Sequence, residues 1–101
     1  VFKQLNIISK DLEERLGRKD IKGKTLTLKI KYKDFSVYTR SKTQDVYYGD
    51  SENLFETARN LWQLRPYDKP VRLLGLSLSN LNTHEKEQIS VQLKLPFPDF
   101  E

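Results

Sequence analysis

The amino-acid sequence predicts a small α+β domain, a two-layer sandwich in which two helices cover one face of a small antiparallel sheet. Three observations predict it. The chain has 101 residues, of which 37% are apolar. Two segments carry apolar residues at helical spacing, and others alternate strictly between polar and apolar residues. Such helices bury their apolar sides against one sheet face and leave the other face to water.

An amphipathic helix is expected at the start of the chain. Apolar residues recur there at spacings of three and four: Phe2, Leu5, Ile8, Leu12 and Leu16. Gly17 is expected to end this helix, because glycine readily adopts the left-handed conformation that follows many helices.

A β-hairpin is expected next. Residues 25–33 alternate strictly, and residues 35–40 continue as a second strand. A two-residue turn at Lys33 and Asp34 would pair Ile30 with Val37. The face opposite the core would then carry Lys29, Lys31, Lys33, Tyr38, Arg40 and Lys42. Because no glycine follows Asp34, a register shifted by one residue remains an alternative.

A second helix and a central strand complete the predicted layers. Asp50 or Ser51 is expected to cap the helix, which ends before Pro66. The strand is expected over residues 71–81, with Leu76 and Leu78 toward the core and Ser77 and Ser79 on the other face. Gly75 inside it indicates a bulge or a close backbone approach. Residues 89–95 alternate again.

Charge is distributed unevenly along the chain. The net charge is +4, but residues 15–42 hold ten Lys or Arg against two Asp, whereas residues 82–101 hold two Lys against four acids. A basic domain with an acidic tail suggests a polyanionic partner, and a lysine-rich solubilising surface is the simpler alternative. A water-exposed sheet face of Lys, Arg, Ser and Thr suits phosphates.

Several classes of site are not indicated. The chain has no Cys, a single His84 and four scattered glycines, so neither a zinc site nor a phosphate-binding loop is expected. The carboxylates are not clustered for metal binding, and the neighbouring Glu13 and Glu14 are expected on a solvated helix face. Trp62 is expected in the core. No catalytic residues are predicted, and we interpret the chain, which begins at Val1, as a piece of a longer protein.

Four segments together resemble the little finger domain of Y-family DNA polymerases, of the bacterial DNA polymerase IV type. They are residues 12–16, 39–43, 54–62 and 71–81, in the family's order over about residues 2–81. The resemblance implies that residues 1–81 grip primer–template DNA through the sheet, beside the palm, fingers and thumb of the same parent chain. The DNA-binding residues expected from the resemblance and the basic face are Lys29, Lys31, Tyr38, Arg40, Ser41, Lys42, Thr43, Arg72, Ser77 and Ser79.

The resemblance also implies properties of the parent protein. That protein would be an error-prone translesion DNA polymerase acting in DNA repair and replication after DNA damage, in the bacterial cytoplasm at the nucleoid. Its Mg²⁺ would be held by the palm, which nothing in this chain matches, so this piece is expected to hold no cofactor.

The tail, residues 82–101, carries a signal of its own. Residues 92–97 resemble the short peptide by which bacterial polymerases bind the sliding clamp. The contacts would come from Gln92, Leu93, Leu95 and Phe97. The family's domain also has a strand before its first helix, which is missing here. Residues 89–95 would either fill the open sheet edge, in cis or from a second molecule, or remain a flexible clamp peptide.

Two functions from other classes remain as alternatives. An RNA-binding α+β module would need two or three exposed aromatic residues on its central strands, and only Tyr38 fits. A protein-interaction domain would use the same basic face for an acidic partner, and the salt dependence of duplex binding separates it from a DNA-binding domain.

Overall fold

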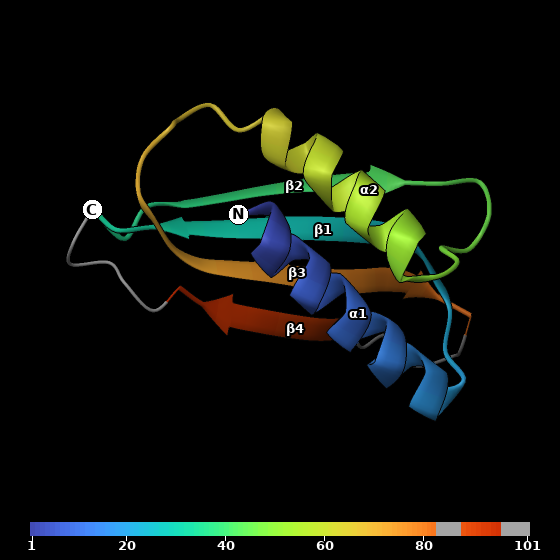
Figure 1. Cartoon of the computed structure of the whole chain (residues 1–101). Helices are drawn as coiled ribbons and strands as arrows, with labels where there is room; N and C mark the ends of the chain where they lie inside the picture. The colour runs from blue at the N-terminus through green and yellow to red at the C-terminus, as the bar shows by residue number, and fades with distance from the viewer. Residues whose placement is uncertain (83–87, 96–101) are drawn as a thin grey trace.

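Two helices lie on one face of a four-stranded antiparallel sheet in the computed structural model, which describes residues 1–82 and 88–95 (Figure 1). The elements are α1 (Phe2–Lys19), β1 (Gly23–Tyr32), β2 (Val37–Thr43), α2 (Ser51–Gln63), β3 (Val71–Leu81) and β4 (Ile89–Lys94). The strands lie in the order β2-β1-β3-β4. The predicted α+β two-layer sandwich is therefore confirmed. None of the described helices is long and apolar enough to cross a membrane.

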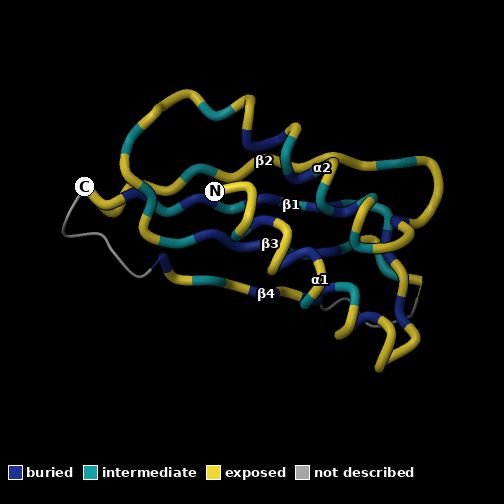
Figure 2. Tube along the Cα trace, viewed as in Figure 1, coloured by how far each residue is buried: buried dark blue, intermediate teal, exposed yellow. Residues whose placement is uncertain are grey.

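The core lies between the helices and the two central strands. Every second residue of β1 and β3 is buried there: Leu26, Leu28, Ile30, Leu74, Leu76 and Leu78. The helices contribute Leu5, Ile8, Leu12, Leu16, Leu54, Ala58, Leu61 and Trp62. Burial alternates along β1, whereas β2 is exposed along most of its length (Figure 2). The predicted inward orientation of Leu76 and Leu78 is confirmed, and so is the core position of Trp62.

The helix ends depend on capping contacts that differ in part from expectation. The predicted end of α1 at Gly17 is wrong, because the helix continues to Lys19 and Asp20 adopts the left-handed conformation, with φ 52°. The backbone N–H of Ile21 then donates to the Leu16 carbonyl at 3.0 Å, and both side chains are buried together. At α2, Asp50 is the N-cap and accepts from the backbone N–H of Asn53.

Glu13 links the two helices. Its Oε2 accepts a hydrogen bond from the backbone N–H of Ser51, the first residue of α2, at 2.7 Å. The carboxylate also lies at the positive end of the α2 dipole. The expectation that Glu13 lies on a solvated helix face is wrong, because α2 packs beside α1 and half-buries it.

The β1–β2 connection differs from the predicted two-residue turn. The N–H of Tyr32 donates to the Ser36 carbonyl at 2.9 Å, which leaves a three-residue loop. Phe35 closes this loop in the left-handed region, with φ 71°. Ile30 therefore pairs with Tyr38 and Leu28 pairs with Arg40. The predicted pairing of Ile30 with Val37 is wrong, and the alternative register, shifted by one residue, is observed.

The sheet edge beyond β3 is occupied in cis by β4. Leu76 pairs with Val91 and Leu78 pairs with Ile89, in antiparallel register. Val91 is 2% exposed, so β4 contributes to the core as well as to the hydrogen-bond ladder. Of the two ways in which residues 89–95 were expected to fill this edge, the pairing within one chain is the one observed.

Two glycines provide a paired test of this packing. A Cβ at Gly23 would lie 2.7 Å from both Leu78 Cγ and the Ser79 carbonyl oxygen, whereas a Cβ at Gly17 would meet nothing within 4 Å. We expect Gly23→Ala to lower the free energy of unfolding by about 1–3 kcal/mol, because β3 must move away. We expect Gly17→Ala to raise it by about 0.5–1 kcal/mol, because alanine favours the helix. Urea denaturation measures both, and an unchanged or raised free energy of unfolding for Gly23→Ala would contradict the packing at Gly23.

Candidate nucleic-acid interface

The sheet face turned away from the helices, called the open face below, consists of four rows of side chains. Alternate residues of a strand and directly paired residues of neighbouring strands share a face, so the register defines each row. The first row is Thr43, Thr25 and Ser79, and the second is Ser41, Thr27, Ser77 and Ser90. The third row is Thr39, Lys29, Gly75 and Gln92, and the fourth is Val37, Lys31, Leu73 and Lys94.

The first two rows present hydroxyl groups. Thr25 Oγ1 lies 2.9 Å from Thr43 Oγ1, and Thr27 Oγ1 lies 2.7 Å from Ser41 Oγ. The side-chain amide of Asn80 donates to Thr25 Oγ1 at 2.7 Å, which orients that hydroxyl. Within each bonded pair one hydroxyl donates to the other, and the O–H of the accepting hydroxyl can donate to an oxygen of a ligand. This half of the open face therefore offers donors without charge.

The last two rows present positive charge. Lys29, Lys31 and Lys94 lie on them, and the four rows contain no carboxylate. Gly75 lies between Lys29 and Gln92, where the missing side chain leaves a shallow depression of about 120 Å³. The ladder is regular at Gly75, so the bulge, one of the two roles expected for this residue, is not observed. A Cβ at Gly75 would lie 3.5 Å from the Val91 carbonyl oxygen, which is an ordinary contact distance. Together the four rows form a surface of hydroxyl groups and cations that suits phosphate oxygens.

Arg72 lies at the irregularity of the sheet. The β1–β3 register shifts between Lys31 and Tyr32, which leaves Arg72 unmatched in the ladder between Val71 and Leu73. Its guanidinium carbon lies 4.5 Å from the centroid of the Phe35 ring, and Lys31 Nζ lies 5.3 Å from the same centroid. Arg72 thus lies beside the fourth row, at the β1–β2 turn.

The shifted hairpin register divides the predicted residues of β2. Ser41 and Thr43 lie on the open face, as do the predicted Lys29, Lys31, Ser77 and Ser79. Tyr38, Arg40 and Lys42 lie on the helix side, because they pair with the buried Ile30, Leu28 and Leu26. Their predicted placement on the same face as Lys29 and Lys31 is wrong, and the turn at Phe35 is the physical reason.

The two sides of β2 also differ in what they touch. Tyr38 packs against the core, and its hydroxyl donates to the Leu64 carbonyl beyond α2 at 3.4 Å. This removes the aromatic residue on which the RNA-binding alternative depended. Arg40 and Lys42 are exposed at the rim of the sheet. The N–H of Gln44 donates to the Lys24 carbonyl and the N–H of Tyr32 donates to the Ser36 carbonyl, so the even-numbered residues of β2 are those that bond to β1. Because bonding alternates along an edge strand, the N–H groups of the odd-numbered β2 residues point outward, away from β1.

The predicted clamp-binding residues lie in and after β4. Gln92 is exposed on the open face, whereas Leu93 packs against the core and Leu95 is 8% exposed. The N–H of Leu95 donates to the Arg72 carbonyl at 2.9 Å, which extends the pairing past β4. Phe97 and His84 lie outside the described residues.

Sequence reasoning missed several residues of the open face: Thr25, Thr27, Thr39, Ser90 and Lys94. The alternation of residues 25–33 already placed Thr25 and Thr27 opposite the buried leucines, so this signal was available. The other three depend on the hairpin register and on the pairing of β4, which no local pattern specifies.

A divalent-metal site does not form in the part of the chain that the structure describes. No three carboxylate or imidazole side chains gather in residues 1–82 and 88–95.

The sequence is similar to known proteins over almost its whole length. Residues 1–95 match the impB/mucB/samB family C-terminal domain. DNA polymerase IV of Bacteroides fragilis is 40% identical over 99% of this chain and 28% of its own length. DNA polymerase IV of Leptospira interrogans is 40% identical over 86% of this chain and 26% of its own length. DNA polymerase IV of Clostridium perfringens is 37% identical over 85% of this chain and 25% of its own length.

The chain spans about a quarter of the length of these relatives. The resemblance to the little finger domain of Y-family polymerases, of the DNA polymerase IV type, is thereby confirmed, and the chain belongs to the impB/mucB/samB family as its C-terminal domain.

Proposed function

We propose that this domain grips the sugar–phosphate backbone of primer–template DNA with its open face and its β2 edge. The observation that carries the proposal is the composition of the four rows, which combine Ser and Thr hydroxyls with three lysines and contain no carboxylate. Lysines and hydroxyls are typical phosphate-binding groups, and such contacts position a protein on DNA without reading its sequence.

The β2 edge determines how the DNA backbone would run. Ser41 and Thr43 lie on the open face, but Arg40 and Lys42 lie on the helix side of the same strand. A phosphate chain lying flat across the open face would not reach all four side chains. A phosphate chain that follows the outer edge of β2 would reach all four side chains. The outward N–H groups of the odd-numbered β2 residues would be further donors. We therefore assign Arg40, Ser41, Lys42 and Thr43 to one DNA strand that runs along β2.

The activity of the whole protein is also part of this proposal. Relatives named DNA polymerase IV support a parent that is a DNA-directed DNA polymerase of the translesion type. Its chemistry and its Mg²⁺ would belong to palm, fingers and thumb domains outside this chain, acting in the bacterial cytoplasm on nucleoid DNA. This domain would keep the primer–template in place during repair synthesis.

The tail would tether the polymerase to the sliding clamp through Gln92, Leu93, Leu95 and Phe97. A clamp peptide of this kind inserts its apolar side chains into a pocket of the partner. Leu95 is buried and Leu93 packs against the core, so neither can insert while β4 is paired with β3. Clamp binding would therefore compete with the pairing of β4 with β3. Only a detached state, in which β4 has separated from β3, would bind the clamp.

Phosphate contacts predict a salt dependence that can be assigned to particular lysines. We expect Lys29→Ala with Lys31→Ala to lower the slope of log Kd against log salt by about 2, because each lost phosphate contact removes about 1. The matched control is Lys10→Ala with Lys19→Ala, which removes the same charge from the exposed surface of α1. Fluorescence anisotropy with a primer–template duplex across a salt series measures both.

An equal fall in slope for the control pair would contradict the open face as the DNA site and favour a charge effect of the whole domain.

The β2 edge is tested in the same assay. Arg40→Ala with Lys42→Ala should weaken duplex binding without a large change in melting temperature, because both side chains are exposed. Unchanged DNA affinity in this variant would contradict their assignment to phosphates.

Competition between clamp binding and β4 pairing predicts opposite effects of two substitutions. Leu93→Ala with Phe97→Ala should abolish clamp binding while DNA affinity stays unchanged. Val91→Ala should lower the free energy of unfolding by about 1–3 kcal/mol, because Val91 is buried. It should also strengthen clamp binding, because it favours the detached state. Thermal melts and titration with the clamp test this, and weaker clamp binding by Val91→Ala would contradict the competition.

A further inference from the structure

An exposed aromatic side chain occupies a strained backbone position at the β1–β2 turn. Phe35 has φ 71° and is 60% exposed. The left-handed region is sterically unfavourable for a residue with a Cβ, and hairpin loops of this kind usually place glycine or asparagine there. Core burial does not offset this cost, because the ring lies outside the core. Strain of this type is often found where a side chain serves in binding.

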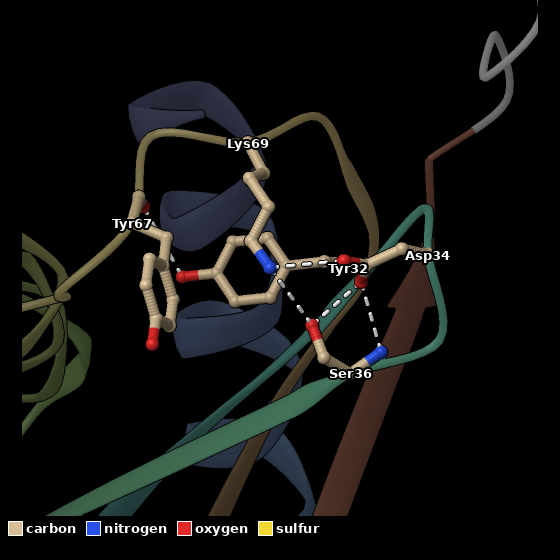
Figure 3. A network of polar contacts seen from close by, with 5 residues as sticks. All are labelled: Tyr32, Asp34, Ser36, Tyr67 and Lys69. Carbon is tan, nitrogen blue, oxygen red and sulfur yellow. Dashed lines mark hydrogen bonds and ion pairs between the residues drawn. The ribbon is translucent and has the colours of Figure 1, made fainter.

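The turn is braced from the helix side by a polar network (Figure 3). Asp34 Oδ1 accepts from the N–H and the hydroxyl of Ser36, at 3.0 and 2.6 Å. Lys69, from the loop before β3, reaches Asp34 Oδ2 at 2.9 Å and lies over the rings of Tyr32 and Tyr67. The Ser36 hydroxyl and then the Lys69 ammonium hold the pKa of Asp34 well below its usual range. These contacts fix the backbone that presents Phe35.

Two cations flank the exposed ring. Arg72 lies 4.5 Å from its centroid through the guanidinium carbon, and Lys31 lies 5.3 Å from it through Nζ. Lys31 belongs to the fourth row of the open face, so the ring lies at one end of the candidate DNA surface. An aromatic platform with an adjacent guanidinium is the chemistry that stacks on an unpaired nucleobase, while the cations neutralise its phosphates.

We propose that Phe35, with Arg72 and Lys31, forms a stacking site for an unpaired nucleobase of the single-stranded template beside the bound duplex. The inference rests on the proposed function, because the duplex on the open face would bring the strand to this end of the sheet. Paired bases inside a duplex are stacked on both sides and do not offer their faces to a side chain. The ligand is therefore single-stranded DNA, and duplex DNA alone does not occupy the site.

Phe35→Gly distinguishes the role of the ring in binding from its effect on folding stability. Glycine has no steric penalty at this φ, so the variant should melt at the same or a higher temperature than the unsubstituted protein. Its effects on binding then reflect the lost ring. Tyr47→Ala is a matched control, because Tyr47 is also an exposed aromatic residue, 41% exposed, with one lysine, Lys24, at 5.1 Å. Phe35→Tyr keeps an aromatic ring and should retain the binding that Phe35→Gly loses.

The experiment compares a blunt duplex with the same duplex carrying an unpaired template extension that contains 2-aminopurine. We expect the extension to tighten binding by about fivefold or more, and stacking to quench the 2-aminopurine fluorescence. Phe35→Gly should lose both effects and keep its affinity for the blunt duplex, whereas Tyr47→Ala and Phe35→Tyr should keep both.

Two failures of this experiment are distinguishable. Normal binding of the blunt duplex with no advantage from the extension, or an advantage and quenching that persist in Phe35→Gly, would overturn the stacking site and leave the proposed function standing. Failure to bind either DNA in low salt would overturn the proposed function and the stacking site with it.

Discussion

The three-residue β1–β2 turn controls which side chains this domain presents to a partner. Its last residue, Phe35, adopts a left-handed conformation, and this single feature sets the register of β2 against β1. A shift of one residue would exchange the two faces of β2 completely. The observed register places the Ser and Thr hydroxyls of β2 on the open face and directs Arg40 and Lys42 to the rim. The turn thus connects local backbone strain with the chemistry of the whole surface.

The two layers explain why the open face can be polar on all four strands. α1 and α2 cover the other side of the sheet, so Leu26, Leu28, Ile30, Leu74, Leu76 and Leu78 are buried there, and the open face carries mostly hydroxyls and lysines (Figure 1). β4 contributes to both faces of the sheet. Val91 completes the core, whereas Gln92 and Lys94 extend the open face. A segment with a structural role thus overlaps the proposed clamp peptide, and the two roles exclude each other at Leu93 and Leu95.

The sequence predicts the central strands well and the edges less well, for a physical reason. In β3, leucine and serine alternate, so burial leaves one choice of face for Leu76, Ser77 and Leu78, and that choice is observed. In β2, neither set of alternate residues is clearly apolar, so only the turn decides the face, and the turn has no glycine to identify it. The contact of Glu13 with Ser51 joins residues 38 positions apart, and no local pattern reports it. The positive charge of the surface is predictable from the sequence. The face on which Arg40 and Lys42 lie depends on the pairing register of β1 and β2.

The most direct test of the open face as the DNA site is a titration of the isotope-labelled domain with a primer–template duplex, followed by backbone amide chemical shifts. We expect the largest changes at Lys29, Lys31 and the odd-numbered residues of β2, with little change along the outer side of α1 at residues such as Asn6 and Lys10. Such a pattern would match phosphate contacts to the open face and the β2 edge. Changes concentrated on α1 and α2, with the four rows unaffected, would contradict the assignment of DNA binding to the sheet.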